Sequence, residues 1–266
     1  MWRSIYVPEK GKLWASNDYS QQEPRMLVHY AELCKLQRAK EAADKYRTDP
    51  NADNHQMMAE MAGIERKPAK ALFLGKCYGM GGAKLCDKLE LDTRWGVFFY
   101  GQYGKKPMYF EEAEHAWEAA RVEGGKAFKV AGEEGQKIID KFDDELPFVH
   151  MLAKECEGRA KKMGFIRTIG GRHCHFPRDN TGQFDWTYKA LNRLIQGSSA
   201  DQTKRALVEV EKAGHFLQLQ VHDELCLSVE NTEEAEQVAE IMRSCMPINV
   251  PSKVDVEIGK SWGDSM

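Results

Sequence analysis

The stretch QVHDELCLSV, Gln220 to Val229, places two carboxylates inside a strand-like pattern. Apolar and polar residues alternate on both sides of the pair, which is the period-2 pattern of half-buried strands. Asp223 falls on the parity of the apolar set, and Glu224 follows it directly. Burying an ionised carboxylate is costly unless a positive charge compensates it. The stretch therefore fits either a tight turn whose tip reaches water or a metal site.

The composition is that of an ordinary globular protein. Of the 266 residues, 42% are hydrophobic and 30% are charged, and the formal net charge is −3, so any basic surface must be local. Seven cysteines without a C-x-x-C pair argue against a disulfide framework or a zinc site and fit a reducing cytoplasm. No apolar run has the length of a signal-peptide core or a membrane span. We expect an intracellular protein without a membrane partner.

The order of expected elements is mixed, which predicts an α+β fold. Residues 92–135 are the least readable part of the chain. Helices are expected from Glu23-Pro24 onward and at residues 55–63, 66–78, 134–163, 188–213 and 232–245. Strands are expected at residues 5–19 (strand, turn, strand), 164–177 (a hairpin turning at Gly170-Gly171), 217–229 and 252–259.

Asp18 stands, like Asp223, at the end of an apolar strand. Two such aspartates could converge across adjacent strands, where they would repel each other unless a cation lay between them. Magnesium prefers a few carboxylate oxygens together with substrate phosphates. Two such ions, about 4 Å apart, can activate a hydroxyl and stabilise a leaving phosphate oxygen. The alternative is two unrelated surface turns.

A third segment, ERKPAKALFLGKCYGMGG, carries a stripe of residues four apart: Arg66, Lys70, Leu74 and Tyr78. Because four residues of a helix advance the side chain by only ~40°, these residues share one face. Two cations at one end and an aromatic ring at the other could hold a triphosphate and a base. The alternative is a solvated basic helix with Tyr78 in the core.

Together these segments resemble the family A DNA polymerases, the bacterial DNA polymerase I family. DYSQQEPR resembles motif A, RKPAKALFLGKCYG resembles motif B, and QVHDE resembles motif C. GFIRTIGGRHCHFP, KALNRLIQGSSADQTKRAL and VDVEIGKSWGD also resemble family segments, and the order agrees from about Arg3 to Asp264. The exceptions are a short gap between His55 and Arg66 and an insertion around residues 92–131. The QQEP sequence within motif A resembles that of viral members of the family.

The resemblance implies a palm, an antiparallel sheet with helices, and mostly helical fingers. Residues 1–50 and 151–266 would form the palm, and residues 51–150, with the insertion, the fingers. The thumb and exonuclease domains of the family have no counterpart in this sequence, so we expect a second polypeptide to supply them, as in a split polymerase, or else a truncated gene. A viral member would work in the host cytoplasm.

The resemblance also implies template-directed DNA synthesis with two magnesium ions as cofactors. Primer-template DNA and deoxynucleoside triphosphates would be the partners. Asp18, Asp223 and the backbone carbonyl of Tyr19 would hold the metals, Glu224 would be an auxiliary carboxylate, and Lys70 would be a general acid for the leaving pyrophosphate.

Further roles follow from the same resemblance. Arg66 and Lys70 would hold the triphosphate, and Glu23 would form a steric gate with Tyr78 that excludes a ribose 2′-hydroxyl. The DNA contacts would be Asn192 and Gln196 in the minor groove, where acceptor positions are shared by all base pairs, and His222 near the primer terminus. The nucleotide-binding set implied is Gln21, Glu23, His55, Arg66, Lys70, Leu74 and Tyr78.

Some positions depart from the family pattern. Leu74 stands where an aromatic ring is usual, Phe73 replaces an asparagine, and Tyr188 replaces an arginine for which Lys189 is a candidate substitute. A single-subunit RNA polymerase is disfavoured by Glu23 and by the HDE wording. The alternative function is a non-catalytic remnant or interaction subunit that retains the polymerase fold.

Overall fold

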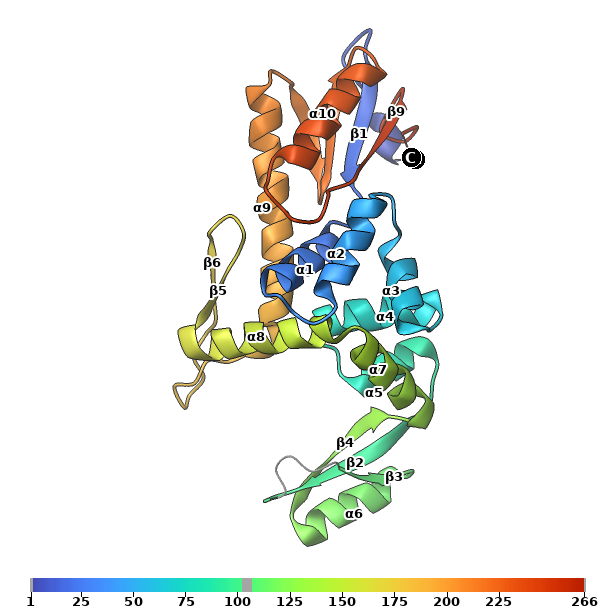
Figure 1. Ribbon diagram of the computed structural model, residues 1–266, viewed down its shortest axis with the longest axis vertical. Coiled ribbons are helices and arrows are strands. Elements are labelled where there is room, and N and C mark those ends of the chain that lie inside the picture. The colour runs from blue at the N-terminus through green and yellow to red at the C-terminus, as the bar shows by residue number, and fades with distance from the viewer. Residues whose placement is uncertain (1, 102–106, 266) are drawn as a thin grey trace. The chain divides into compact units, whose positions relative to one another are not determined.

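The computed structural model describes residues 2–101 and 107–265, and the chain divides into two compact units (Figure 1). Residues 1–54 and 151–266 form the first unit, and residues 55–150 form the second unit. The palm and fingers assignments of these parts stay predictions. None of the helices within the described ranges is both long and apolar enough to cross a membrane.

The first unit is built on a four-stranded antiparallel sheet in the order β7-β8-β1-β9. Strand β1 (Leu13–Tyr19) lies between β8 (Glu224–Val229) and β9 (Val254–Gly259), and β7 (Leu217–Val221) lies at one edge. The predicted hairpin over 217–229 and the C-terminal strand are therefore confirmed. The mixed α+β architecture predicted from the sequence is also confirmed.

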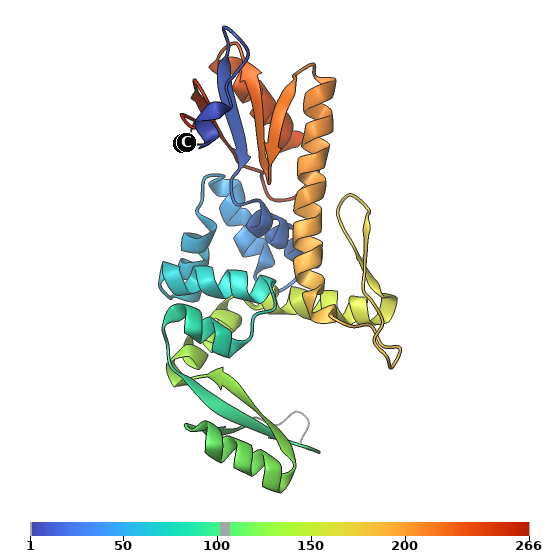
Figure 2. The same cartoon turned by 180° about the vertical axis from the view of Figure 1, so that it is seen from behind.

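Alternation along the strands gives this sheet two different faces. One face carries Ala15, Tyr19 and Leu225 and packs against helices α9 (Ala190–Lys212) and α10 (Thr232–Ser244). Figure 2 shows α9, in orange, running beside the sheet. The opposite face carries the alternate residues of β1, which leaves Asp18 on the side away from these two helices.

The remaining elements of the first unit are short or helical. They are η1 (Trp2–Ile5), α1 (Gln22–Leu33), α2 (Ala39–Thr48), part of α8 (Pro147–Met163), β5 (Phe165–Arg167), β6 (His173–His175) and η2 (Thr187–Lys189). The expected strand at residues 5–7 is wrong. There the rings of Trp2 and Tyr6 pack edge-on against Trp262, so side-chain packing fixes this segment in place of a strand ladder.

The second unit combines helices with the inserted segment. Helices α3 (Asn54–Ala62), α4 (Arg66–Cys77), α5 (Gly82–Leu89) and α7 (Glu133–Glu145) flank the insertion in sequence. The insertion itself contains β2 (Thr93–Phe99), β3 (Met108–Phe110), α6 (Ala113–Glu123) and β4 (Gly125–Ala131), with sheet order β3-β2-β4. Helix α6 packs on one face of this sheet through Val97, Ala116 and Ala120.

Candidate functional site

Asp223 lies at the tip of a hairpin, and Glu224 is the first residue of the strand that follows. Val221 pairs with Glu224, so His222 and Asp223 form a two-residue turn between β7 and β8. His222 has φ +55°, the left-handed conformation that tight hairpin turns require. The Asp223 carbonyl accepts a hydrogen bond from the Tyr19 N–H at 3.4 Å. The turn is therefore attached to the end of β1, beside Asp18.

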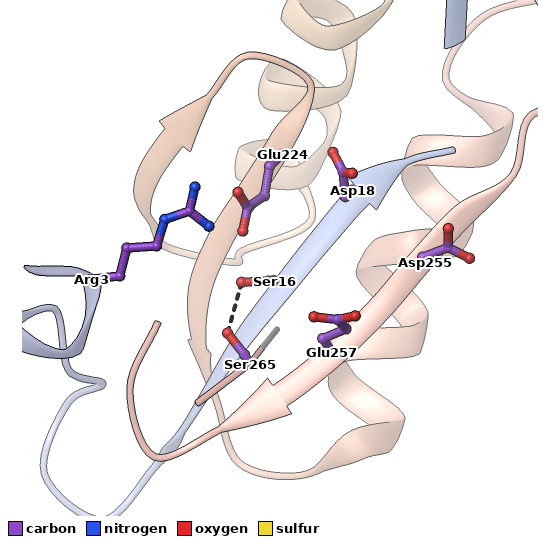
Figure 3. A pocket seen from close by; sticks show the side chains of 7 residues that line it. All are labelled: Arg3, Ser16, Asp18, Glu224, Asp255, Glu257 and Ser265. Carbon is purple, nitrogen blue, oxygen red and sulfur yellow. Dashed lines mark hydrogen bonds between the residues drawn. The ribbon is translucent and has the colours of Figure 1, made fainter. Parts of the chain in front are cut away.

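Asp18 is the centre of a group of carboxylates on the face of the sheet away from α9 and α10. It pairs with Glu224 across β8 and with Asp255 across β9, and Ser16 pairs with Glu257. Directly opposed residues of antiparallel strands project on the same side. A hollow of about 300 Å³ is lined by Arg3, Ser16, Asp18, Glu224, Asp255, Glu257 and Ser265. Figure 3 shows how these side chains lie.

The charges of this group act on one another. Although Asp18 keeps access to solvent, partial desolvation raises the pKa of its carboxyl from 3.8 to about 7, and repulsion from Asp223, Glu224, Asp255 and Glu257 adds to the shift. The pKa of Asp223 is also raised, mainly by desolvation. Burial is the largest cause of both pKa shifts, and repulsion from Glu224 adds to each.

Sequence reasoning missed the residues that hold Glu224. The indole Nε1 of Trp262 donates to Glu224 Oε1 at 2.9 Å, and the Cys226 thiol donates to the same oxygen at 3.4 Å. Burial, followed by the charge of Glu224, raises the pKa of the Cys226 thiol to about 12, which keeps it a donor. The Arg3 guanidinium lies 4.5 Å from the Trp262 ring centroid. No short-range pattern in the sequence links these positions.

Asp255 and Glu257 were also missed, although a signal was present. They alternate with Val254, Val256 and Ile258 in the last strand, so period-2 alternation places both carboxylates on the face opposite the apolar residues. The register then sets Asp255 beside Asp18. Pairing partners, which the sequence does not specify, were the missing information.

The start of α1 is fixed by amide and guanidinium contacts. Gln21, with φ +57°, accepts a hydrogen bond from the Asn54 N–H through its side-chain oxygen at 2.6 Å. The Arg25 guanidinium is buried and donates to the carbonyl oxygens of Ser20, Pro50 and Pro251. These contacts join α1 to the loop before α3 and to the segment before β9. Glu23, the predicted gate residue, lies half-buried in the first turn of α1.

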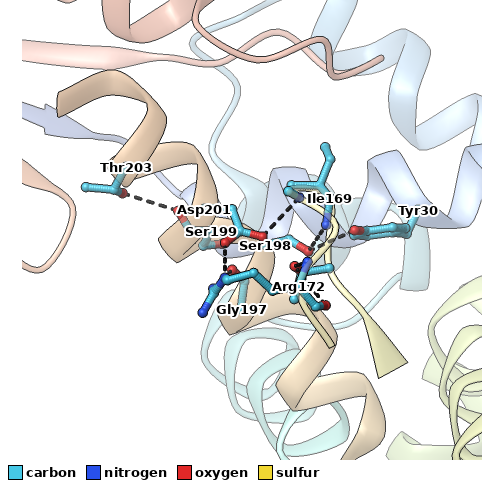
Figure 4. Close-up of polar contacts among 10 residues, drawn as sticks. Tyr30, Ile169, Arg172, Gly197, Ser198, Ser199, Asp201 and Thr203 are labelled. Atoms are coloured by element: carbon cyan, nitrogen blue, oxygen red, sulfur yellow. Dashed lines mark hydrogen bonds and ion pairs between the residues drawn. The ribbon is translucent and has the colours of Figure 1, made fainter. Parts of the chain in front are cut away.

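The hairpin β5–β6 is attached to α9 by a polar network (Figure 4). The Ser198 hydroxyl accepts from the Ile169 N–H at 3.1 Å and contacts the Tyr30 hydroxyl at 2.8 Å. Asp201 accepts from the Gly170 N–H at 3.0 Å and from the Arg172 guanidinium. The predicted DNA-contacting residues, Asn192 and Gln196, lie one turn apart on this same helix and reach solvent.

In the second unit, the stripe on α4 faces solvent. Arg66 and Lys70 are exposed, Leu74 is half-buried, and Tyr78, directly after the helix, is 41% exposed. The alternative of Tyr78 in the core is therefore excluded. Leu72 and Phe73 form part of the buried side of the helix.

Two positions that depart from the family pattern are Phe73 and Tyr188, and the structure explains the first. The Phe73 ring is 1% exposed and meets the His55 ring edge-on at 6.3 Å, so it serves the core of the second unit. The Lys189 ammonium lies 4.9 Å from the Trp186 ring centroid, in cation–π contact. Tyr188 is exposed.

The structure thus assembles the predicted site in part. Asp18, Tyr19, His222, Asp223 and Glu224 meet at one end of the first unit's sheet. The α4 residues and His55 belong to the second unit. Within the described residues, no three histidine, cysteine, aspartate or glutamate side chains form a ready-made metal cluster.

Comparisons with known proteins agree with these motifs. A DNA-directed DNA polymerase of Pseudomonas phage M6 is 55% identical over 273 residues, covering 100% of this chain and 40% of the phage protein. The DNA polymerase DpoZ of Salmonella phage PMBT28 is 30% identical over 243 residues, covering 85% of this chain and 34% of that protein. The chain therefore spans well under half the length of these relatives.

A solved structure shares the fold. It is the POL domain of Pol1 from M. smegmatis in complex with DNA primer-template and dNTP, with a TM-score of 0.71 and 24% identity, covering 99% of this chain and 42% of that one. The family model described as DNA polymerase family A matches residues 120–264, more than half of the sequence. The chain belongs to DNA polymerase family A.

Proposed function

We propose that this chain performs template-directed DNA synthesis, transferring a nucleotide from a deoxynucleoside triphosphate to the 3′-hydroxyl of a primer. The observation that carries the proposal is the convergence of Asp18 and Asp223, from opposite ends of the sequence, at one end of a sheet. The names of the two phage relatives support it, and so does the primer-template and dNTP complex of the solved neighbour.

The donor set around Asp18 fits two magnesium ions. Carboxylate oxygens are the ligands that hard divalent cations prefer, and the pKa of Asp18 is raised first by burial and then by the neighbouring carboxylates, whose repulsion a cation would relieve. Asp18, Asp223 and the carbonyl oxygen of Tyr19 would hold the ions, with Glu224 as an auxiliary carboxylate. When bound, magnesium activates the primer hydroxyl and stabilises the leaving phosphate oxygen.

Residues of α4 would handle the nucleotide. Arg66 and Lys70 are exposed on one side of the helix, where their charges can bind a triphosphate. Lys70 would then donate a proton to the leaving pyrophosphate oxygen. Glu23 and Tyr78 would exclude a 2′-hydroxyl by occupying the space that it needs.

The remaining predicted contacts would position the DNA and the base. Asn192 and Gln196 would donate hydrogen bonds to minor-groove acceptors that all base pairs share. His222, in the turn beside Asp223, would approach the primer terminus. Gln21, His55 and Leu74 complete the proposed nucleotide-binding set.

Tight binding of duplex DNA would need a part of the polymerase beyond this chain. Phosphate contacts dominate affinity for DNA, and the chain spans 40% of the Pseudomonas phage polymerase. We place the thumb and exonuclease functions in the remaining length of such relatives, whether it is joined to this chain or supplied by a second polypeptide. Synthesis would take place in the host cytoplasm.

Primer extension on a recessed DNA duplex with magnesium and deoxynucleotides tests the function. We expect extension by the chain together with the remaining length of a phage relative. It should vanish in Asp223→Ala and persist in Asp144→Ala, a control at an exposed aspartate on α7. Extension that survives in Asp223→Ala, or no extension by the folded complex, would overturn the proposal.

A further inference from the structure

The inserted segment, residues 93–131, forms a sheet with two chemically different sides. Trp95, Val97 and Phe99 point toward α6 and pack with its alanines. Alternation sends Arg94 and Phe98 to the other side. The orientation agrees at Gly96, where an added Cβ would meet Val130 and Pro107, both away from the α6 cluster.

The side away from α6 carries aromatic rings. Phe98 and Phe128 stack at 5.1 Å with an interplanar angle of 14°, and Phe98 is 44% exposed. Tyr109 pairs with Gly96 on the neighbouring strand and is 39% exposed. Tyr100, directly after β2, is 73% exposed. Several exposed aromatic rings gathered on one surface are typical of a binding face.

Cations accompany the rings. Lys126 pairs directly with Phe98 and is exposed, and the Arg94 guanidinium lies 3.7 Å from the Tyr109 ring centroid. The strands β2, β3 and β4 contain no aspartate or glutamate. In contrast, α6 on the opposite side carries Glu114, Glu118 and Glu123. The Arg94 guanidinium also pairs with Glu133 Oε1 at 3.6 Å, so Lys126 supplies the exposed positive charge of this side, whereas the α6 side carries several carboxylates.

Exposed rings beside an exposed lysine are the chemistry that recognises unpaired nucleotides. Bases stack on aromatic side chains, and each stacked base contributes roughly 1–3 kcal/mol, while lysine and arginine neutralise the phosphates. Protein interfaces are likewise enriched in aromatic residues and arginine, so a second copy of this chain is tested below as the alternative occupant.

We propose that the face formed by Arg94, Phe98, Tyr100, Tyr109, Lys126 and Phe128 binds single-stranded nucleic acid. Along β2 the face extends about 20 Å from Arg94 to Tyr100, from the rise of ~3.3 Å per strand residue. Within the proposed function the ligand is the unpaired template strand. That identification rests on the proposed function, whereas the binding itself does not.

The test is fluorescence anisotropy of the full chain with a labelled oligothymidylate of about 12 nucleotides, within the range of ~4–16 nucleotides bound by comparable modules. The double variant Phe98→Leu/Phe128→Leu keeps apolar side chains in the module and removes both rings. We expect it to weaken binding at least tenfold. Phe216→Leu removes a phenylalanine that is 74% exposed in the first unit and should leave the affinity unchanged.

A second variant addresses charge without disturbing packing. Lys126→Glu should weaken binding several-fold and lower the slope of log affinity against log salt by about one, because one phosphate contact is lost. Circular dichroism would verify that each variant is folded. Absence of binding by the unsubstituted chain would overturn the proposal, and so would equal affinity in Phe98→Leu/Phe128→Leu, Lys126→Glu and Phe216→Leu.

Other occupants give distinguishable results. If the face joins two copies of this chain, the ring-deleting variant changes the sedimentation coefficient and not the anisotropy, which would also overturn the proposal. The binding mixture contains neither deoxynucleotides nor magnesium. Its outcome is therefore independent of primer extension, and failure of either test leaves the other proposal standing.

Discussion

Asp18 and Glu224 are directly opposed residues of β1 and β8, so their carboxylates project side by side from one face of the sheet. Asp223 lies directly before Glu224, at the tip of the same hairpin, and Asp255 on β9 is opposed to Asp18 from the other side of β1. A strand pair chosen for stability alone would not align like charges, which are destabilising when directly opposed. The arrangement costs folding free energy in the absence of a cation.

Replacing Asp18 with asparagine should stabilise the metal-free chain. Asp18→Asn keeps the shape and removes the charge that Asp223, Glu224 and Asp255 repel. We expect unfolding in urea, with chelator present at pH 8, to require about 1 kcal/mol more than in the unsubstituted chain, after discounting for solvent screening of an exposed group. Millimolar magnesium should stabilise the unsubstituted chain by mass action and have little effect on Asp18→Asn.

The matched control is Asp144→Asn, which removes an exposed carboxylate on α7. It should change neither the unfolding free energy nor the response to magnesium by a measurable amount. A lower stability of Asp18→Asn in chelator would contradict repulsion between Asp18 and the neighbouring carboxylates.

Trp262 should stabilise the folded chain through its hydrogen bond to Glu224. Trp262→Phe keeps a ring in a site that is 2% exposed and removes the donor at 2.9 Å. A hydrogen bond to a charged group contributes about 1.5–3 kcal/mol. A double-mutant cycle with Glu224→Ala, measured by urea unfolding, should give a coupling energy of about 1 kcal/mol or more.

Trp2→Phe is the control, because Trp2 packs edge-on against the same indole and is 63% exposed. Its cycle with Glu224→Ala should be additive. Additive behaviour of Trp262→Phe as well would mean that the indole supports packing alone.

The sequence predicted those parts of the fold whose signals are local. The hairpin over 217–229 has continuous alternation, and α10 has both an apolar face and Asn231, which caps it by accepting from the Glu234 N–H. The helix expected over 134–163 is two helices, α7 and α8, because Pro147 disfavours helical backbone at Leu146. That break could have been predicted from the proline alone.

Other parts of the fold and of the site could not be predicted, because they depend on contacts between residues far apart in the sequence. The 3-10 turn at Trp2–Ile5 is fixed by Trp262, at the far end of the sequence. The insertion could not be read from the sequence because apolar and aromatic residues occupy both sides of its sheet, so no single periodicity dominates. Asp18 and Asp223 were recognisable as motif residues. The partners of Glu224 were not, since they come together only in the tertiary structure.

Gly170 should tolerate no side chain. An added Cβ would lie 2.6 Å from Asp201 Oδ2, the oxygen that accepts the Gly170 N–H. Gly170→Ala must therefore displace the turn or Asp201, and overpacking of this kind costs about 1–3 kcal/mol. We expect a lower midpoint in urea together with loss of the contact between Asp201 and Arg172, visible as a shift of the arginine Nε resonance.

Gly158→Ala is the matched control, because nothing lies within 4 Å of its added Cβ and Gly158 is inside α8. Alanine is the better helix former there by about 1 kcal/mol, so this variant should be more stable than the unsubstituted chain. A Gly170→Ala protein as stable as the unsubstituted chain would show that the turn is not held tightly to α9.

His29 should make stability depend on pH. It is buried on α1 and accepts the Asn249 N–H at Nδ1, 3.0 Å, and burial lowers its pKa below the usual 6.5. Between the lowered pKa and 6.5 the unfolded chain binds a proton that the folded chain does not. Folded stability is therefore complete above pH 6.5 and falls as pH decreases through this window, by about 1.4 kcal/mol per pH unit at most.

Urea unfolding of the chain and of His29→Gln, from pH 8 to pH 5 with chelator, isolates this contribution. Glutamine can accept the Asn249 N–H through its amide oxygen and does not titrate. The difference in unfolding free energy between the two proteins should therefore favour the unsubstituted chain less at pH 5 than at pH 8. Asp18, whose pKa of about 7 acts in the opposite sense, cancels in this difference because both proteins contain it. A difference that is constant across the range would mean that the imidazole is protonated equally in the folded and unfolded chains, contrary to its burial.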